Sequence, residues 1–420
     1  MSSRPAYAPD LARYVEAHWP RATPLTVPLA VLEEALSTAF HASLTSEEGR
    51  PTRFRLLLTP AEALPAGGTF NEGVLRLMFE RSRGLSADEL RRLAPAVAFD
   101  TSLIGAHTDD SRALRIWGVA HSGPAWLAPT WGGRDVVPNW TFDPIIHVTA
   151  PGHVAVRCAG KLVGALERGV LVDAMMDVFQ SEWFPKLFER EREEVRAKHA
   201  ARQANAESPT LAEHSLVVLV GQQMLRRAIR LIRNAGHGGM LLILDRTDGD
   251  ADHLQSIRLK YSIAQDEPSH RYHGLLLRIL EVIAASTSKT SVGWADFVAN
   301  ASPELAKLEQ AVFEWSRVIA NLAAIDGAVV LDKRLGVLAF GAEVKGELPL
   351  NPRVWRALDT EGHQRRPDEV ESVGTRHRAA YRFVNEHPRG LAVVVSHDGN
   401  VSFVANQDGE IVVWEQSMGP

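Results

Sequence analysis

Apolar and polar residues alternate with two different periods along the first 170 residues, and this mixture predicts an α/β domain. Residues 31–40 carry apolar side chains at helical spacing. Short apolar runs typical of strands occupy residues 53–58, 114–117, 145–148, 154–156 and 161–166. Ser86 and Glu89 form a capping box, which predicts a short helix that Pro95 ends.

A long helical pattern follows, from residue 170 to about residue 203. Its apolar residues share one face as far as Pro185, which should kink the helix or end its first half. Beyond Pro185, acidic and basic residues alternate from Glu189 onward, a pattern typical of a solvated helix with many ion pairs. We expect an exposed connecting helix and then a short linker at residues 204–209; the alternative is a helix that pairs with its copy in a dimer.

The remainder of the chain predicts a second α/β domain with a mixed sheet flanked by helices. Helical patterns cover residues 211–235, 273–285 and 303–322, and a further helix begins at Thr375. Strand patterns cover residues 238–246, 257–263, 328–331, 337–340, 391–396, 401–405 and 411–414. The expected organisation is an N-terminal α/β domain at residues 1–170, a connecting helix and linker at 171–207, and a C-terminal domain at 208–420.

Composition narrows the class of protein. The 420 residues suffice for two cores, and 45% hydrophobic with 23% charged residues is typical of a soluble globular protein. A net charge of −5 argues against nucleic acid or an anionic membrane surface as a partner. Cys158 is the only cysteine, which excludes an intrachain disulfide and any CxxC site. Because no apolar run is long enough for a membrane span, we expect a cytoplasmic protein.

Asp326-Gly327-Ala328 places a carboxylate beside two small residues, where an apolar strand begins. Such a carboxylate can hold a divalent cation against a phosphate, and small neighbours allow a nucleotide to approach the backbone. Asp-Gly is also among the commonest turn dipeptides, so this motif taken alone is better explained by a plain turn.

Gly374-Thr375-Arg376-His377-Arg378 combines a hydroxyl, two guanidiniums and an imidazole at the start of a helix. Thr375 is the expected N-cap residue. Two arginines in a first turn oppose the helix dipole, which indicates a bound anion such as a phosphate. The alternative is a pair of arginines that extend into solvent.

Two further segments are candidates for the same site. Ser396 ends a strand and Asp398 follows it, so a hydroxyl and a second carboxylate could face one pocket. Asp398-Gly399-Asn400 is also ordinary hairpin-turn chemistry. The glycine-rich residues 236–239 could bind phosphate, although a glycine C-cap followed by a tight turn explains them better.

In this order, the motifs resemble those of the diadenylate cyclase family, whose members condense two ATP molecules into cyclic di-AMP. The run from Gly374 to Arg378 continues with Ala379-Ala380, and Asp326-Gly327-Ala328 precedes it. The resemblance implies that Asp326 binds Mg²⁺ or Mn²⁺ and orients the attacking 3′-hydroxyl, with Gly327 and Ala328 beside the nucleotide. It implies that the triphosphate is held by Gly374, Thr375, Arg376, His377 and Arg378, with Ser396 nearby and Asp398 as a second metal ligand.

This chain departs from the family pattern in two places. His397-Asp398 stands where the family commonly has two glutamates, and residues 343–373 replace a compact loop that usually contacts adenine. The first half of the chain resembles the sensor-type domains that precede some bacterial cyclase domains.

The resemblance implies an ATP-dependent nucleotidyltransferase that acts as a homodimer or a higher homo-oligomer, with facing active sites and N-terminal regulation. The altered acids and loop leave an alternative open, a catalytically inactive domain that senses ATP or cyclic di-AMP. A DNA-associated scaffold is disfavoured because the sequence has no helix-hairpin-helix pattern and no basic patch.

Overall fold

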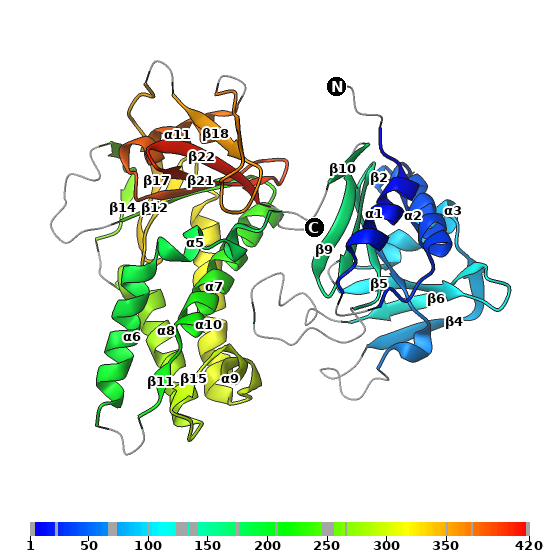
Figure 1. Ribbon diagram of the computed structural model, residues 1–420, viewed down its shortest axis with the longest axis horizontal. Coiled ribbons are helices and arrows are strands. Elements are labelled where there is room, and N and C mark those ends of the chain that lie inside the picture. Colours follow the sequence, from blue (N-terminus) through cyan, green and yellow to red (C-terminus); the bar gives the residue numbers. More distant parts are fainter. Residues whose placement is uncertain are drawn as a thin grey trace. The chain divides into compact units, whose positions relative to one another are not determined.

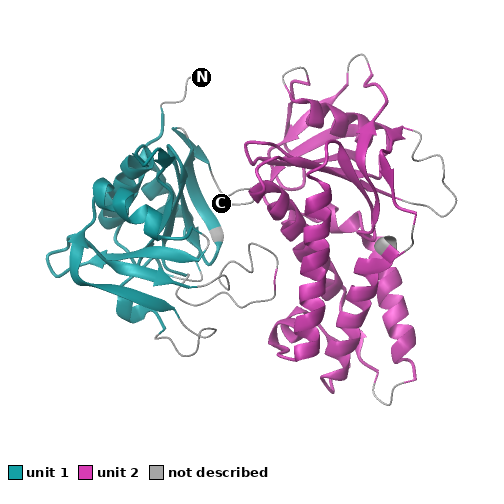
Figure 2. Ribbon diagram, turned by 180° about the vertical axis from the view of Figure 1, so that it is seen from behind, with its two compact units in different colours: residues 1–130, 135–175, 419–420 teal, residues 131–134, 176–418 magenta. Residues whose placement is uncertain are grey.

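The chain folds into two compact units, which are coloured separately in Figure 2. The first contains residues 1–130, 135–175 and 419–420, and the second contains residues 131–134 and 176–418. The computed structural model describes residues 5–21, 24–65, 74–99, 101–122, 133, 142–167, 169–172, 176–205, 209–245, 256–264, 267–349, 352–370 and 373–416. Residue 246 of one predicted strand and residues 206–208 of the predicted linker lie outside these ranges.

An eight-stranded sheet forms the centre of the first unit, in the order β10-β9-β8-β7-β3-β5-β6-β4. Its strands are β3 (Phe54–Leu58), β4 (Leu75–Gly84), β5 (Ser102–Thr108), β6 (Leu114–His121), β7 (Ile145–Ala150), β8 (His153–Cys158), β9 (Lys161–Glu167) and β10 (Val170–Val172). Only the pair β3–β5 is parallel among the neighbours in this order. The strands predicted from apolar runs are all present in this sheet.

Helices pack on this sheet through one apolar core. They are α1 (Ala8–His18), α2 (Leu29–Ser43) and α3 (Ala87–Leu93), with short 3₁₀ turns at Ala61–Ala63 and Ala94–Ala96 and a small ladder of β1 (Ser46–Glu47) and β2 (Arg50–Pro51). Leu36 of α2 and Leu56 of β3 are fully buried in this core. The Ser86 hydroxyl accepts a hydrogen bond from the Glu89 backbone at 3.2 Å, so the predicted cap of α3 is confirmed.

The long helix predicted from residue 170 is wrong over its first half. Gly169 turns the chain with a φ of +81°, and β10 then pairs antiparallel with β9. A 3₁₀ turn at Val178–Gln180 and a short helix α5 (Trp183–Lys186) come next, and α6 (Glu189–Gln203) begins only after Pro185. The free edge of β9 offers backbone hydrogen bonds to residues 170–172, and periodicity along the chain cannot reveal such a partner.

A mixed sheet forms the centre of the second unit, in the order β13-β17-β16-β12-β20-β21-β22-β18-β19, with β14 also paired to β17. Its strands are β12 (Gly239–Leu244), β13 (Ile257–Arg258), β14 (Tyr261–Ser262), β16 (Ala328–Asp332), β17 (Val337–Val344), β18 (Val354–Ala357), β19 (Arg365–Pro367), β20 (Leu391–Val395), β21 (Val401–Gln407) and β22 (Glu410–Gln416). β12 runs parallel to β16 and antiparallel to β20.

Helices cover both faces of this sheet (Figure 1). On one side lie α7 (His214–Asn234), α8 (Glu267–Ala285), α9 (Trp294–Ala299) and α10 (Pro303–Leu322), with a two-stranded ladder of β11 (Leu211–Ala212) and β15 (Ser291–Val292). On the other side lies α11 (Thr375–Glu386). Alternate residues of β12 face opposite ways: Leu241 belongs to the core under α7 and α10, and Leu242 to the core under α11.

The connecting helix α6 is part of the second unit. Its Val195 and His199 are buried, and Phe184 and Phe188 just before it join the core that α7, α8 and α10 share. The helix was expected to be exposed because its sequence is mostly charged. Several of its charged side chains instead pair with residues of the unit, so the boundary between the units falls at residues 175–176 and not near residue 207.

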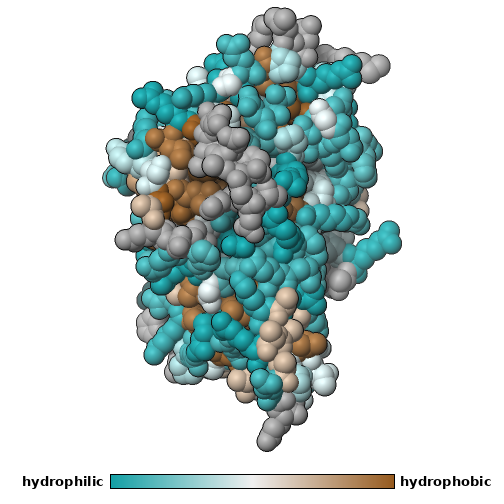
Figure 3. Space-filling view, turned by 90° about the vertical axis from the view of Figure 1, so that its left-hand side faces the viewer, coloured by the Kyte–Doolittle hydropathy of each residue, from teal (hydrophilic) through white to brown (hydrophobic). Residues whose placement is uncertain are grey.

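In the face shown in Figure 3, hydrophilic side chains predominate and apolar ones gather in separate patches. Large apolar side chains that stay exposed in the second unit include Leu211, Tyr261, Val318, Ile325 and Leu358. Among the helices that could be searched, none combines the length and the apolar character that a membrane span requires.

Candidate active site

Both candidate motifs lie at one end of the sheet in the second unit. Strands β12 and β16 are parallel and begin at Gly239 and Ala328, whereas β20 is antiparallel and ends at Val395, opposite Gly239. Neighbouring strands lie about 4.8 Å apart. The segments just before β12, just before β16 and just after β20 therefore meet here, and we call this place the site end of the sheet.

Helix α11 begins at the site end as well. Arg376 donates a hydrogen bond from Nη2 to the backbone oxygen of His237, at 3.2 Å. Gly238 has a φ of +65°, and a Cβ there would lie 2.5 Å from Nη1 of Arg376 and 2.7 Å from the Val395 oxygen. The glycine is therefore required by the close approach of the arginine and of β20. Gly236, with a φ of +74°, ends α7 as the C-cap interpretation predicts.

The predicted N-cap is wrong by one residue. Gly374 is the N-cap, in an extended conformation with φ −66° and ψ 168°, and its carbonyl accepts the Arg378 backbone N–H at 3.2 Å. Thr375 is the first helical residue, and both it and Gly374 are exposed. Gly374 has no side chain, so the N-cap residue itself cannot cap the first N–H groups of the helix.

Arg376 and Arg378 share an unusual set of partners. Arg378 donates from Nη1 to the Val373 backbone oxygen at 2.9 Å, much as Arg376 donates to His237. Within the described ranges, neither arginine has a carboxylate within 4.0 Å. Neutral carbonyl oxygens orient the two guanidiniums without neutralising their charge, so both remain able to bind an anion.

His377 lies deeper than the arginines. Its Nε2 is 3.2 Å from the Ser402 hydroxyl of β21, and its ring stands edge-on to Tyr381 at 6.4 Å between centroids. Burial, and then the positive charge of Arg356, lower the pKa of His377, although Asp368, Glu415 and Asp398 act in the opposite direction. The imidazole is consequently neutral near pH 7, and it can orient a phosphate oxygen by hydrogen bonding but adds no charge.

Residues 343–373, which replace the compact loop of the family pattern, contribute a polar network that the sequence did not predict. Strands β18 and β19 pair with each other, and β18 adds to the sheet beside β22. The Tyr381 hydroxyl of α11 donates to Oδ2 of Asp368 at 3.0 Å, and Arg356 Nη2 lies 3.0 Å from the other carboxylate oxygen. The network fastens the inserted hairpin to the helix that carries the arginines.

Asp326 is fully exposed at the site end, and its nearest described cation is the Lys260 ammonium, 4.0 Å from Oδ2. Lys260 lies closer to Glu343, at 2.9 Å, and mainly this hydrogen bond raises the pKa of Lys260. Gly327 has a φ of +115°, and a Cβ there would lie 2.6 Å from the backbone carbon of Gly341. The close approach of β17 therefore explains this glycine without any ligand, whereas the carboxylate of Asp326 remains available.

Ser396 and Asp398 form a tight turn at the same end. The Ser396 backbone N–H donates to the Asn400 oxygen at 2.8 Å, and the Asn400 amide donates to Oδ2 of Asp398 at 2.9 Å. Asp398 thus performs the turn role that was its alternative interpretation. It also lies near enough to His377 to raise its pKa. A metal-binding role for Asp398 and a phosphate-binding role for Ser396 stay predictions.

The exposed carboxylate of Asp326 fits Mg²⁺ or Mn²⁺. These ions commonly use one or two protein carboxylates and complete their shell with substrate phosphates and water.

Among the residues searched, Glu189, Glu193 and His214 have ligand atoms within 4.8 Å of one another. They lie on α6 and at the start of α7, and Glu193 already bonds Arg196 at 2.6 Å. We interpret this group as an exposed ion-pair cluster.

Comparisons with known proteins bear on the first unit. A family model described as a probable sensor domain, DACNV, matches residues 23–121. Two solved structures are similar: a double mutant of DacA from Staphylococcus aureus (17% identity, 47% of this chain and 89% of that chain, TM-score 0.23) and a hypothetical membrane spanning protein from Bacillus cereus (16% identity, 56% and 94%, TM-score 0.22). No curated protein matches the chain. The chain is a mixed α/β protein with a sensor-like N-terminal unit and a C-terminal sheet domain.

Proposed function

We propose that the second unit is a diadenylate cyclase, which condenses two ATP molecules into cyclic di-AMP and two pyrophosphates. One observation carries the proposal: Asp326-Gly327-Ala328 and the start of α11, which are far apart in the sequence, meet at the site end of one sheet. The match of residues 23–121 to a probable sensor domain supports a signalling enzyme with a regulatory first unit.

The first turn of α11 is the proposed phosphate clamp. The uncapped N–H groups after Gly374 and the hydroxyl of Thr375 supply donors at the positive end of the helix dipole. Arg376 and Arg378 supply two positive charges that no described carboxylate neutralises. His377, neutral and held by Ser402, would donate or accept one further hydrogen bond.

Asp326 would hold the metal ion, which supplies Lewis-acid stabilisation of negative charge on the phosphates. The same carboxylate would orient a ribose 3′-hydroxyl and accept its proton. In the reaction this hydroxyl oxygen forms a bond to the α-phosphorus of the other ATP, and the bond from that phosphorus to the pyrophosphate oxygen breaks.

The step happens twice, once on each ATP, and closes the ring of cyclic di-AMP. Two sites must therefore face each other, which requires a homodimer or a higher homo-oligomer. The protein contributes mostly positioning and charge stabilisation to phosphoryl transfer, and effects of this kind account for large rate enhancements.

The test is an incubation of the full chain with ATP and Mn²⁺ or Mg²⁺, with products resolved by chromatography. We expect one cyclic di-AMP for every two pyrophosphates released, and a specific activity that falls when the protein is diluted below its dimer dissociation constant. Release of ADP and phosphate, or of AMP and pyrophosphate alone, would contradict the proposal. ATP binding without any turnover would favour the sensor alternative.

A further inference from the structure

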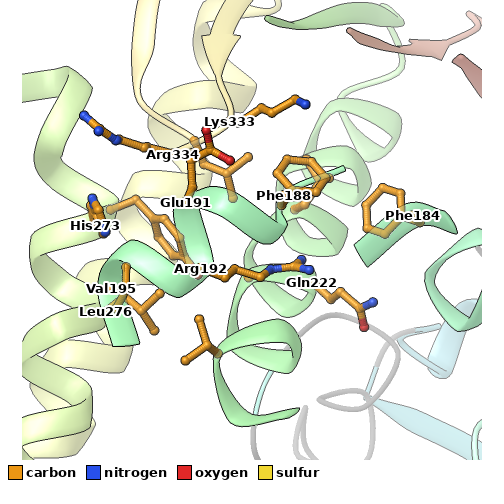
Figure 4. A pocket seen from close by; sticks show the side chains of 15 residues that line it. Phe184, Phe188, Glu191, Arg192, Val195, Gln222, His273, Leu276, Lys333 and Arg334 are labelled. Atoms are coloured by element: carbon orange, nitrogen blue, oxygen red, sulfur yellow. The ribbon is translucent and has the colours of Figure 1, made fainter. Parts of the chain in front are cut away.

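A small cavity lies at the other end of the same sheet, where α6 packs against α7, α8 and the turn between β16 and β17 (Figure 4). The space in it that the centre of a water molecule can reach is about 30 Å³, so the room between the wall atoms exceeds that of a single water. Most of its wall is apolar and includes Phe184, Phe188, Val217, Leu225 and Leu276. It contains none of the residues of the proposed cyclase site.

The cavity wall also contains a buried cation that has no carboxylate in direct contact among the described residues. Arg192 is only 8% exposed and donates from Nη1 to the Pro185 backbone oxygen at 2.6 Å, while its guanidinium lies 5.3 Å from the centre of the Phe188 ring. No carboxylate of the described chain lies within 4.0 Å of it. Burial lowers the pKa of Arg192, so the folded protein bears a desolvation penalty for its charge.

Other charged residues of the cavity wall differ in this respect. Lys333 pairs with Asp245, Arg334 with Glu194, and Glu191 with Arg190. In Figure 4, Arg192 points into the space beside Gln222, whereas Glu191 points toward the turn that carries Lys333 and Arg334. The carboxylate nearest in sequence is therefore directed away from the space that Arg192 faces.

Two neutral polar groups of α8 complete the wall. The Tyr272 hydroxyl is buried and has no hydrogen-bond partner, and the same holds for Nε2 of His273. Gly221 of α7 leaves room beside the hydroxyl, since a Cβ there would lie 3.3 Å from the Tyr272 oxygen. A buried donor without a partner is costly, and the cost is recovered when an acceptor arrives.

We propose that this cavity binds the carboxylate group of a small aliphatic acid. The charge of Arg192 and the hydroxyl of Tyr272 would recognise the two carboxylate oxygens, and the aromatic and aliphatic wall would receive the short tail. Such a ligand would bridge α6 to α7 and α8, so its occupancy would fasten the segment that follows the sensor-like unit. The proposal concerns a site separate from the cyclase motifs and goes beyond the proposed function.

The test uses the full chain without ATP and measures thermal unfolding and binding heat with sodium propionate. We expect a saturable rise of the melting temperature, about 3 °C at ten times the dissociation constant, and no rise with propionamide or with sodium chloride at equal ionic strength. An equal rise with chloride, or no rise with propionate, overturns the proposal. Because nothing is turned over, the result is independent of cyclase activity.

Two variants localise the binding. Arg192→Met keeps an unbranched apolar stem but removes the guanidinium and should abolish the propionate shift, whereas Arg196→Met, on the same helix and paired with Glu193, should retain it. Tyr272→Phe removes one oxygen and should weaken propionate binding at least about threefold, without lowering the melting temperature of the ligand-free protein. A full shift in Arg192→Met overturns the proposal. So does a Tyr272→Phe variant that is destabilised without ligand and has unchanged affinity, since the hydroxyl would then serve a structural water.

Discussion

The two ends of the sheet in the second unit differ in the partners of their positively charged side chains. At the end opposite the site end, the Asp245 carboxylate forms an ion pair with Arg190 at 3.0 Å. It also pairs with Lys333 and with Arg389, each at 3.2 Å. At the site end, Arg376 and Arg378 bond only backbone oxygens among the described residues. One end concentrates cations around a carboxylate, and the other leaves the two arginines of α11 without one among the described residues.

The difference separates structural charges from charges available to a ligand. An ion pair that is nearly buried, such as Lys333 with Asp245, is largely satisfied, and breaking it leaves an uncompensated charge. An arginine fixed by carbonyl oxygens keeps its net charge and a preferred direction, which is what anion recognition needs. By the same criterion Arg192 resembles Arg376 and Arg378 more than it resembles its neighbour Arg190.

The largest effect is expected from removal of the segment that fastens the opposite end. A protein that begins at residue 176 should fold, whereas one that begins near residue 208 should not, because it lacks α5 and α6. The loss includes five buried side chains, Val178, Phe179, Phe184, Phe188 and Val195. Their burial is worth about 10 kcal/mol, comparable with the whole stability of a domain. Circular dichroism and urea unfolding of both proteins measure the difference.

A shorter protein that unfolds cooperatively with the same midpoint would show that α6 contributes nothing to the fold of the unit. It would restore the boundary near residue 207 that the sequence alone suggests. The ion pair between Arg190 of α6 and Asp245 would then be a surface contact that the fold does not require.

The next effect contrasts two carboxylates. Asp326→Asn should lower cyclase activity at least about 100-fold and leave stability unchanged, because the side chain is fully exposed and an amide is a poor ligand for a hard cation. Asp245→Asn should lower the free energy of unfolding by about 3 kcal/mol, mainly because the nearly buried Lys333 loses its carboxylate partner, while activity per folded molecule is retained. Steady-state rates and urea midpoints of both variants give the comparison; the reverse pattern would contradict the assignment of the two ends.

A third prediction uses pH at the opposite end. Burial lowers the pKa of His273 to about 4, below its unfolded value, so the neutral form stabilises the fold above pH 6.5 and this stabilisation is lost as the pH falls toward 4. Between pH 6.5 and pH 5 the native protein should lose about 2 kcal/mol relative to His273→Phe. Urea unfolding at both pH values tests this.

The fourth prediction concerns nucleotide affinity. Arg376→Ala should weaken ATP binding about tenfold, because a charge-assisted hydrogen bond is lost, and should not lower stability by removing an ion pair. Arg389→Ala, at an exposed arginine paired with Asp245, should leave ATP affinity unchanged. Equilibrium binding of ATP in the presence of Ca²⁺ measures both. Equal losses in the two variants would show that the effect is general electrostatics.

Much of the fold could be predicted because periodicity reports burial. The helix at residues 303–322 and the three strands after α11 appear where the pattern indicates. The errors share one cause, which is a partner that is remote in the sequence. Residues 170–172 became a strand because the edge of β9 was free, and the charged helix α6 became part of a core because Asp245 and Arg334 pair with its side chains.

The candidate site shows the same division. Asp326 and the residues from Gly374 to Arg378 could be proposed because their motifs are local and chemically unusual. Asp368 and Arg356 could not, since an acid and an arginine in a segment that resembles a loop carry no local signal. Their role arises only when β18 joins β22 and brings them to Tyr381.

The smallest expected effect tests whether the network of Arg356, Asp368 and Tyr381 stabilises the fold or takes part in ligand binding. Tyr381 is fully buried, and burial raises the pKa of its hydroxyl, which therefore stays protonated and donates to Asp368. Tyr381→Phe should lower the free energy of unfolding by about 1 kcal/mol, the usual net value of one hydrogen bond, because Asp368 keeps Arg356 as a partner. Tyr261→Phe, at an exposed tyrosine stacked on Phe340, is the matched control and should change nothing. Cyclase activity should fall less than about threefold in Tyr381→Phe, since the first turn of α11 keeps its contacts to His237 and Ser402. A large loss of activity at unchanged stability would instead place Asp368 and Tyr381 in the site itself, and the paired charges at the site end would then take part in catalysis.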